Sequence, residues 1–297
     1  MRLSSFLHYG LNRLTNFNNS IFSFSIAKQQ QYVNHFLEPE DDFERAYDQY
    51  CCQMKLNRWK AITLVLNVVS LPIIIFYLLK PSDKVKYKKE VNSIFFSDGK
   101  PQNIIPDILI ESAGFIELIE NKKELFTKED RIFFNKLFKR YPLSWHFLLK
   151  CLMKIRYYSY QIEALKPERI IVCNEYSFTC TALTRYCRCR NILHINVMHG
   201  EKLFYMRDSF FRFDKCYIWD EYYKNLFCRL RADKDQFIVA IPPSLLFDKS
   251  FCREKEIDYI YYLGNERGDT LEKIIQFMNI IKKKRNLQVA VRPHPRY

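Results

Sequence analysis

The stretch from residue 169 to residue 241 constrains the fold more than any other part of the chain. Four short apolar runs, rich in β-branched and aromatic residues, are separated there by segments of helical or loop pattern, and a helix is predicted at 176–190. The runs are RIIVC (169–173), LHINVM (193–198), KCYIW (215–219) and FIVAI (237–241). Such runs are typical of strands that are buried on both faces and joined by crossover helices, so the alternation predicts an α/β domain with a parallel sheet.

A second unit of the same kind begins after a polar and charged segment, residues 247–256, which we interpret as a linker. A strand is predicted at 258–263, a helix at 269–282 and another strand at 287–291, close to the last residue of the sequence. One β-α-β unit cannot bury both faces of a sheet. We therefore expect that the chain is a fragment, or that something else completes this second domain; we favour a fragment.

The first part of the chain, residues 1–90, is predicted to be a helical region that associates with a membrane. Residues 61–79 contain no charge and, at about 1.5 Å per residue, form a helix nearly long enough to cross a bilayer core. Basic residues lie on both sides of it, so its orientation does not follow from the charges. A spanning helix, a buried helix and a helix on the membrane surface all stay open, and the basic flanks favour the last.

A further helical region is predicted at 129–160, with an interruption near Pro142. It mixes basic and aromatic residues, so it suits either a membrane surface or a core. Between residue 90 and the linker, residues 91–246 form the predicted first Rossmann-like domain, which includes this helical region; residues 257–297 begin the second.

The composition limits the classes of partner. A content of 48% hydrophobic and 27% charged residues is typical of a folded chain. The net charge of +14 calls for an anionic partner, which is a nucleic acid, a membrane face or an anionic substrate.

The ten cysteines include no Cys-x-x-Cys pair, and residues 1–30 show no secretory signal. These features favour buried thiols in a reducing cytoplasm over disulfides or a zinc site.

Polar residues follow several of the predicted strands, where ligands of parallel α/β proteins bind. Asp98, after the short β-rich run 91–96, and Glu175, after the run 169–173, are carboxylates that could remove a proton from an attacking hydroxyl. His199 could act as an acid, a base or a phosphate contact. It precedes Gly200, a residue that allows a tight turn and the close approach of a ligand to the backbone. Asp98 and His199 are equally compatible with ordinary surface turns.

The sequence RPHPR follows the last predicted strand. Its two prolines, Pro295 among them, stiffen the loop around His294. Arg292 and Arg296 supply positive charge in a form that suits a phosphate group. Gly264 opens a loop between a predicted strand and a helix N-terminus, which makes it a further candidate phosphate contact. Together these residues predict a donor-binding site for a nucleotide phosphate.

Two of these segments, in this order along the chain, resemble known families. MHGEKLFYMRDSFFRFDKCYIWDEYYKNLF (198–227) is similar to a region of capsule and O-antigen transferases, in which a strand ends in His-Gly and a Tyr-rich helix follows. VRPHPR (291–296) resembles the His-Pro motif of bacterial sialyltransferases, polysialyltransferases and CDP-glycerol glycerophosphotransferases. The resemblance implies a GT-B-like fold of two Rossmann-like domains, the second incomplete here. It also implies that the His-Pro segment contacts a cytidine nucleotide, and that an acidic-acidic-Gly motif supplies the base. The nearest match to that motif is Ser97-Asp98-Gly99.

The resemblance implies an inverting glycosyltransferase of capsule or lipopolysaccharide O-antigen synthesis. It would move a sialic acid-like sugar from a cytidine-nucleotide donor to a lipid-linked oligosaccharide. Asp98 or Glu175 would deprotonate the acceptor, and His199 would line the cleft. Arg292, His294 and Arg296 would stabilise the departing phosphate.

We expect neither a metal nor a cofactor, because protein cations would carry that stabilising role. The expected location is the inner face of the cytoplasmic membrane, whose anionic surface would account, with the donor, for the basic charge. The alternatives are a CDP-glycerol-type transferase, a non-catalytic truncated homologue that serves in assembly, and a nucleic-acid-binding protein. No nucleic-acid-binding module is visible in the sequence, so we expect no nucleic-acid partner.

Overall fold

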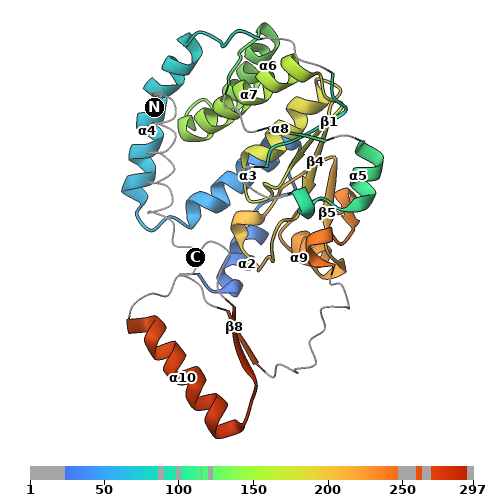
Figure 1. Ribbon diagram of the computed structural model, residues 1–297. Coiled ribbons are helices and arrows are strands. Elements are labelled where there is room, and N and C mark those ends of the chain that lie inside the picture. The colour runs from blue at the N-terminus through green and yellow to red at the C-terminus, as the bar shows by residue number, and fades with distance from the viewer. Residues whose placement is uncertain are drawn as a thin grey trace. The chain divides into compact units, whose positions relative to one another are not determined.

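The computed structural model describes residues 24–85, 90–97, 102–114, 116–119, 123–246, 259–262 and 269–292 (Figure 1). The chain divides into two compact units, the first ending at Leu245 and the second beginning at Leu246.

The first unit is built on a parallel sheet of six strands, in the order β2-β1-β3-β4-β5-β6. The strands are β1 (Ser93–Phe95), β2 (Ile116–Leu118), β3 (Arg169–Val172), β4 (Leu193–Val197), β5 (Lys215–Ile218) and β6 (Phe237–Val239). The predicted α/β class with a parallel sheet is therefore confirmed. The strand order reverses between β1 and β3, which makes the carboxyl ends of these two strands the switch point where doubly wound sheets bind ligands.

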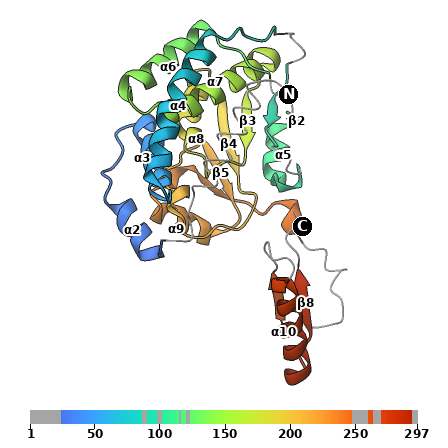
Figure 2. The same ribbon diagram turned by 90° about the vertical axis from the view of Figure 1, so that its left-hand side faces the viewer.

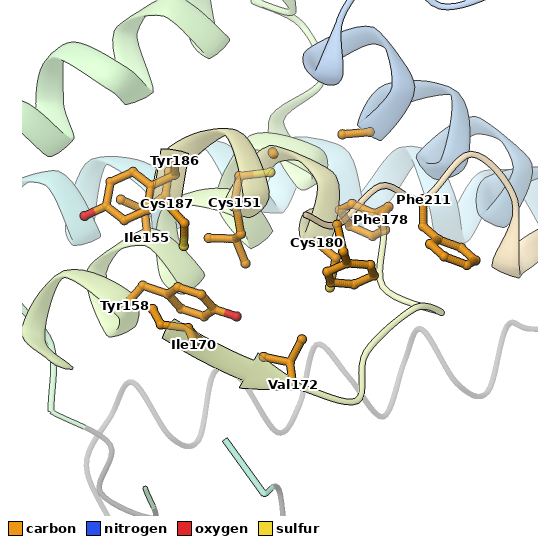
Figure 3. Close-up of a cluster of buried hydrophobic side chains, with 14 of the residues drawn as sticks. Cys151, Ile155, Tyr158, Ile170, Val172, Phe178, Cys180, Tyr186, Cys187 and Phe211 are labelled. Carbon is orange, nitrogen blue, oxygen red and sulfur yellow. The ribbon is translucent and has the colours of Figure 1, made fainter. Parts of the chain in front are cut away.

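Helices cover the two faces of this sheet unequally (Figures 1 and 2). The larger core lies on the face that carries Ile170 and Val172 of β3, and the smaller core lies on the face that carries Ile171. The larger core packs against α3 (Asp42–Lys55), α4 (Lys60–Leu79), α6 (Lys128–Arg140), α7 (Trp145–Leu165), α8 (Thr179–Arg188) and α9 (Glu221–Arg229). The smaller core packs against α5 (Asp107–Ala113). Figure 3 shows side chains of β3, α7 and α8 meeting in the larger core.

A buried carboxylate ties three of these helices together. Asp130 is fully buried near the start of α6, where it also completes a capping box with Thr127. Its carboxylate accepts hydrogen bonds from Ser159 of α7 at 2.6 Å and from Tyr186 of α8 at 2.6 Å, and it pairs with Arg190 at 2.7 Å. A buried charge is tolerated only when it is paired and hydrogen-bonded in this way. Asp130 therefore fixes the packing of α6, α7 and α8.

The N-terminal helices belong to the same compact unit as the sheet. Helix α2 (Ile26–Asn34) is capped by Ser25, and Asp41 caps α3 with its carboxylate. Phe43, Ala46 and Tyr50 of α3 are members of the larger core. Helices α3 and α4, which the sequence patterns separate from the Rossmann-like domain, thus contribute directly to its core.

The second unit is the predicted β-α-β arrangement. Strands β7 (Tyr259–Tyr262) and β8 (Val289–Arg292) pair in parallel, and α10 (Asp269–Arg285) connects them. Ile275, Phe277 and Ile280 of α10 are each about half exposed. A helix with this much exposed apolar surface is typical of one that packs against further structure.

Candidate functional site

Two of the predicted site residues, Glu175 and His199, can be placed in full, and Arg292 is the last residue of β8. The remaining predicted residues lie outside the described residues; they are Asp98, Gly264, His294, Pro295 and Arg296. The site is therefore built from the loops that follow β3 and β4.

Glu175 and His199 meet because their strands are neighbours. Val172 at the end of β3 pairs with Asn196 of β4, so the segments that follow leave the same edge of the sheet. Nδ1 of His199 lies 3.9 Å from Oε1 of Glu175, an ion-pair distance. The Lys202 ammonium pairs with the same oxygen. These side chains form what we call the edge cluster: Glu175, His199 and Lys202.

The carboxylate of Glu175 is held in its charged form. Its side chain is 1% exposed, and burial alone would raise its pKa. The positive charges of Lys202 and His199 overcome burial and lower the pKa to about 2. Asn196 of β4 donates a hydrogen bond from Nδ2 to Oε2 at 3.2 Å. A buried carboxylate with so low a pKa is a weak proton acceptor, so the geometry favours Glu175 as a fixed counter-charge rather than as the base.

His199 is the better placed group for exchanging a proton. Its side chain is 22% exposed, whereas Glu175 and Lys202 are buried. The neighbouring carboxylate would stabilise the imidazolium that forms when His199 accepts a proton. The ring of Tyr176 stands edge-on to the imidazole, with 6.1 Å between ring centroids, and limits its orientations. The arrangement is thus suited to general acid–base chemistry at the carboxyl edge of the sheet.

Two glutamines of α3 support the backbone of the site. Gln49 donates to the carbonyl oxygens of Glu175 at 2.9 Å and Arg207 at 3.1 Å. Gln53, one turn further along the helix, donates to the carbonyl oxygens of Tyr176 at 2.8 Å and Arg207 at 3.2 Å. Each amide therefore joins the loop after β3 to the segment around Arg207, which places α3 directly behind the edge cluster.

Cations are present around the site, but those nearest to it have acidic partners. Arg207 lies 5.4 Å from the ring centroid of Tyr176 and pairs with Asp208 at 2.7 Å. Lys202 lies 5.9 Å from the same ring and pairs with Glu175. The described cluster therefore does not resemble an open phosphate site, and the charge for a donor phosphate would come from elsewhere in the chain.

Gly200 contributes space and not a special backbone conformation. Its φ does not lie in the left-handed region, so its backbone conformation does not itself require glycine. A Cβ built on Gly200 would meet nothing within 4 Å. The backbone beside His199 is consequently open to a ligand.

The end of β1 lies at the switch point, beside the end of β3. The backbone N–H of Phe96 donates to the carbonyl oxygen of Ile171 at 3.0 Å, which continues the pairing of β1 with β3. Ser97 follows and is buried. The next residue, Asp98, is outside the described residues. The site loops thus extend from the β1–β3 boundary to the end of β4.

Among the described residues, no cluster of three or more His, Cys, Asp or Glu side chains could hold a metal ion. The sequence contains one Asp-x-Asp element in this part of the chain, from Asp233 to Asp235. It precedes β6 and lies at the opposite end of the strand from the site loops. Both carboxylates pair with Arg212, so their charges are already compensated.

Lys202, Gln49 and Gln53 are parts of the site that sequence patterns did not reveal. Lys202 lies three residues after His199, in the segment that carries the family resemblance. This proximity is the sequence feature that could have identified it as a site residue. Gln49 and Gln53 are spaced by four residues and are buried or half-buried on α3, a spacing that indicates a shared helix face.

Comparisons with protein-family models, with curated proteins and with solved structures found no match for this chain, so its class rests on its parallel α/β sheet.

Proposed function

We propose that this chain is a glycosyltransferase that uses a nucleotide-activated sugar. The observation that carries the proposal is the pairing of His199 with buried Glu175 at the carboxyl edge of a parallel sheet. Ligands of such sheets bind at this edge, and a histidine oriented beside a carboxylate is a common device for activating a hydroxyl group. The second β-α-β unit leads into the basic sequence RPHPR, which supplies groups suited to a phosphate.

The edge cluster would act on the acceptor. The acceptor hydroxyl oxygen attacks the anomeric carbon of the sugar while Nε2 of His199 takes the hydroxyl proton, because Nδ1 is buried and faces Glu175. The bond between that carbon and the nucleotide phosphate oxygen breaks, and the electron pair leaves with the phosphate. Glu175 stays ionised throughout and stabilises the imidazolium, and Lys202 keeps that carboxylate charged. Asp98, in the loop after β1, is the other candidate base.

The donor side of the proposal rests on the second unit. Arg292, His294 and Arg296 would stabilise the charge that develops on the departing phosphate, as preorganised cations do in other transfer reactions. Together with the family resemblance, they favour a cytidine nucleotide and a sialic acid-like sugar. A lipid-linked oligosaccharide in capsule or O-antigen synthesis is the proposed acceptor. Transfer of glycerol phosphate from CDP-glycerol is the alternative within the same donor class.

A non-catalytic role is the second candidate function. The second unit has two paired strands among its described residues, and α10 leaves Ile275, Phe277 and Ile280 exposed. In such a role the first unit would serve as a binding module. Such a protein would bind a partner or an acceptor but would not bind a nucleotide.

The proposal is tested by calorimetric titration of the full chain with CMP, CDP, UDP and GDP. We expect cytidine nucleotides to bind selectively, and the His294→Ala variant to bind them at least about tenfold more weakly because a phosphate contact is lost. His35→Ala, which removes an exposed histidine at the end of α2, is the matched control and should bind like the unchanged chain. Selective binding of UDP or GDP would exclude the cytidine donor, and the absence of any nucleotide binding would favour the non-catalytic role.

A further inference from the structure

Helix α4 carries an apolar face that the other described residues leave exposed. Within the described residues, α4 alone is long and apolar enough to cross a membrane. Only 28% of its most apolar stretch is buried inside the protein. The apolar side chains that stay exposed, at 37% to 79%, are Leu64, Val65, Val68, Val69, Ile75, Phe76 and Leu79. At 100° per residue these positions fall on one side of the helix. An uncovered apolar stripe of this length is typical of an interaction surface.

The opposite side of α4 packs against α7 (Figure 2). The buried positions are Leu66, Ser70, Ile73, Ile74 and Tyr77, a helical spacing that defines a second stripe. In the middle of the helix, the amide of Asn67 donates to the carbonyl oxygen of Leu143 at 2.9 Å and accepts from the backbone N–H of His146 at 3.0 Å. The helix is therefore held at its centre as well as by its apolar contacts.

The C-terminal end of α4 is held by a buried arginine of α7. Arg156 is fully buried, and its guanidinium donates to the carbonyl oxygens of Tyr77 at 2.9 Å and Lys80 at 3.4 Å. It also pairs with Glu124 at 3.4 Å. These contacts satisfy carbonyl groups that a helix end otherwise leaves without partners.

This packing is incompatible with α4 crossing a bilayer. A spanning helix would carry its attached stripe into the hydrocarbon region, and with it Arg156, Asn67 and the polar groups of α7. Charged and unsatisfied polar groups are costly there. A helix that keeps one stripe on a folded domain and offers the other to lipid lies in the plane of the interface instead.

The residues at the two ends of the exposed stripe suit a lipid headgroup region. Trp59, 42% exposed, begins the helix, and the Arg58 guanidinium lies 5.5 Å from its ring centroid. Lys60 at this end is an exposed cation, and Lys84, five residues after the last residue of α4, is another. Tryptophan is enriched at membrane interfaces, and each cation near an anionic surface strengthens binding.

We propose that the exposed stripe of α4 inserts in the plane of an anionic lipid surface and makes this chain a peripheral membrane protein. The occupant is lipid because the stripe is apolar along its length and is bordered at both ends by cations. This inference does not depend on the proposed reaction, since lipid binding requires neither donor nor acceptor.

The test is flotation of the full chain with vesicles of phosphatidylcholine, alone or mixed with phosphatidylglycerol. We expect binding to the anionic vesicles, release by high salt, and extraction by alkaline carbonate. The double variant Leu64→Glu/Val68→Glu should bind at least about tenfold more weakly, because it places two carboxylates in the stripe. Leu37→Glu is the matched control, because Leu37 is 88% exposed and precedes α3; its binding should not change. Circular dichroism checks that each variant is folded.

Several outcomes would overturn this inference. They are an unchanged affinity in the double variant, the absence of vesicle binding by the unchanged chain, and resistance to carbonate, which would indicate a spanning helix. A further outcome, dimer formation, is measured by analytical sedimentation. A dimer that the double variant dissociates, without vesicle binding, would assign the stripe to a second copy of the chain.

Discussion

Replacing Lys202 by methionine should destabilise the first unit by an amount that depends on pH. Methionine fills a similar volume but leaves the carboxylate of Glu175, 1% exposed, without its ion-pair partner. The lysine is itself only 7% exposed, so water cannot easily take its place. Removing one partner of a buried pair is costly because the other charge stays buried.

The magnitude follows from the pKa of Glu175. In the folded chain this pKa is lowered from its ordinary value of 4.5 to about 2. Each tenfold change in proton affinity corresponds to about 1.4 kcal/mol, so the interactions that hold Glu175 ionised contribute ~3 kcal/mol at neutral pH. Lys202 is the largest of the favourable contributions. We therefore expect Lys202→Met to lower the free energy of unfolding at pH 7 by about 2–4 kcal/mol.

The pH dependence has a defined sign. Because the folded pKa of Glu175 lies below its ordinary value, the stabilisation is present above about pH 4.5 and is lost as the pH falls toward 2. In Lys202→Met, burial acts without the compensating ammonium and raises that pKa. Protonation then relieves the buried charge, so the difference between the variant and the unchanged chain should be largest at pH 7 and should shrink on acidification.

Urea unfolding followed by tryptophan fluorescence measures this effect. All three tryptophans, Trp59, Trp145 and Trp219, lie in the first unit, so the signal reports on that unit. Lys224→Met is the control, because Lys224 forms a surface pair with Glu221, whose side chains are 37% and 65% exposed. It should cost less than about 1 kcal/mol. Equal effects of the two variants at pH 7, or a Lys202→Met effect that grows on acidification, would refute the reasoning.

Two further predictions concern the proposed base and the attachment of α4. His199→Gln should lower the rate of sugar transfer by about 100-fold or more while nucleotide binding, measured by calorimetry, stays the same; unchanged transfer would remove His199 from the reaction and leave Asp98 as the candidate base. Arg156→Met should lower the free energy of unfolding by about 3–5 kcal/mol, because Glu124 and two helix-end carbonyls lose a buried partner. Arg140→Met, whose guanidinium is 32% exposed, should cost less than about 1 kcal/mol in the same urea titration, and an equal loss would contradict a special role for Arg156.

The strands at the centre of the sheet could be predicted because burial on both faces leaves a continuous apolar run. Strands β3, β4 and β5 lie within three of the apolar runs identified in the sequence, and the edge strand β6 lies within the fourth. The edge strand β2 has three residues and leaves Leu118 43% exposed, so it lacks that signature. Helix α5 has only seven residues and ends at Gly114, whose φ is +66°. Elements this short carry too few residues for a periodic pattern.

The start of α8 was predicted too early, and the reason lies in the site. A helix was expected from Tyr176, but α8 begins at Thr179. The backbone N–H of Ser177 donates to the carbonyl oxygen of Asn174 at 2.9 Å, and the N–H of Asn174 is taken by the side chain of Asn196. These bonds form a turn that presents Glu175 to the edge of the sheet. A local helical pattern is overridden here by contacts between strands.

The candidate site was predictable only where it depends on strand order. Glu175 and His199 follow strands that neighbour each other, so their proximity follows from the topology of a parallel sheet. The contact between Gln49 and the loop at Glu175 joins residues 126 positions apart, and no local pattern encodes it. The low pKa of Glu175 also depends on tertiary packing, because burial and the position of Lys202 together determine it.

The side-chain amides of Gln49 and Gln53 hydrogen-bond to the backbone of both site loops. In a chimeric protein, the N-terminal helices and the sheet would therefore have to be exchanged together. A chimera that transplanted residues 91–246 alone would leave the carbonyl groups of Glu175, Tyr176 and Arg207 facing a foreign helix or solvent. Recombination at the start of α2 would carry the supporting amides along with the loops. Crossover points that preserve the site therefore lie before α2 and not at the boundary between α4 and the sheet.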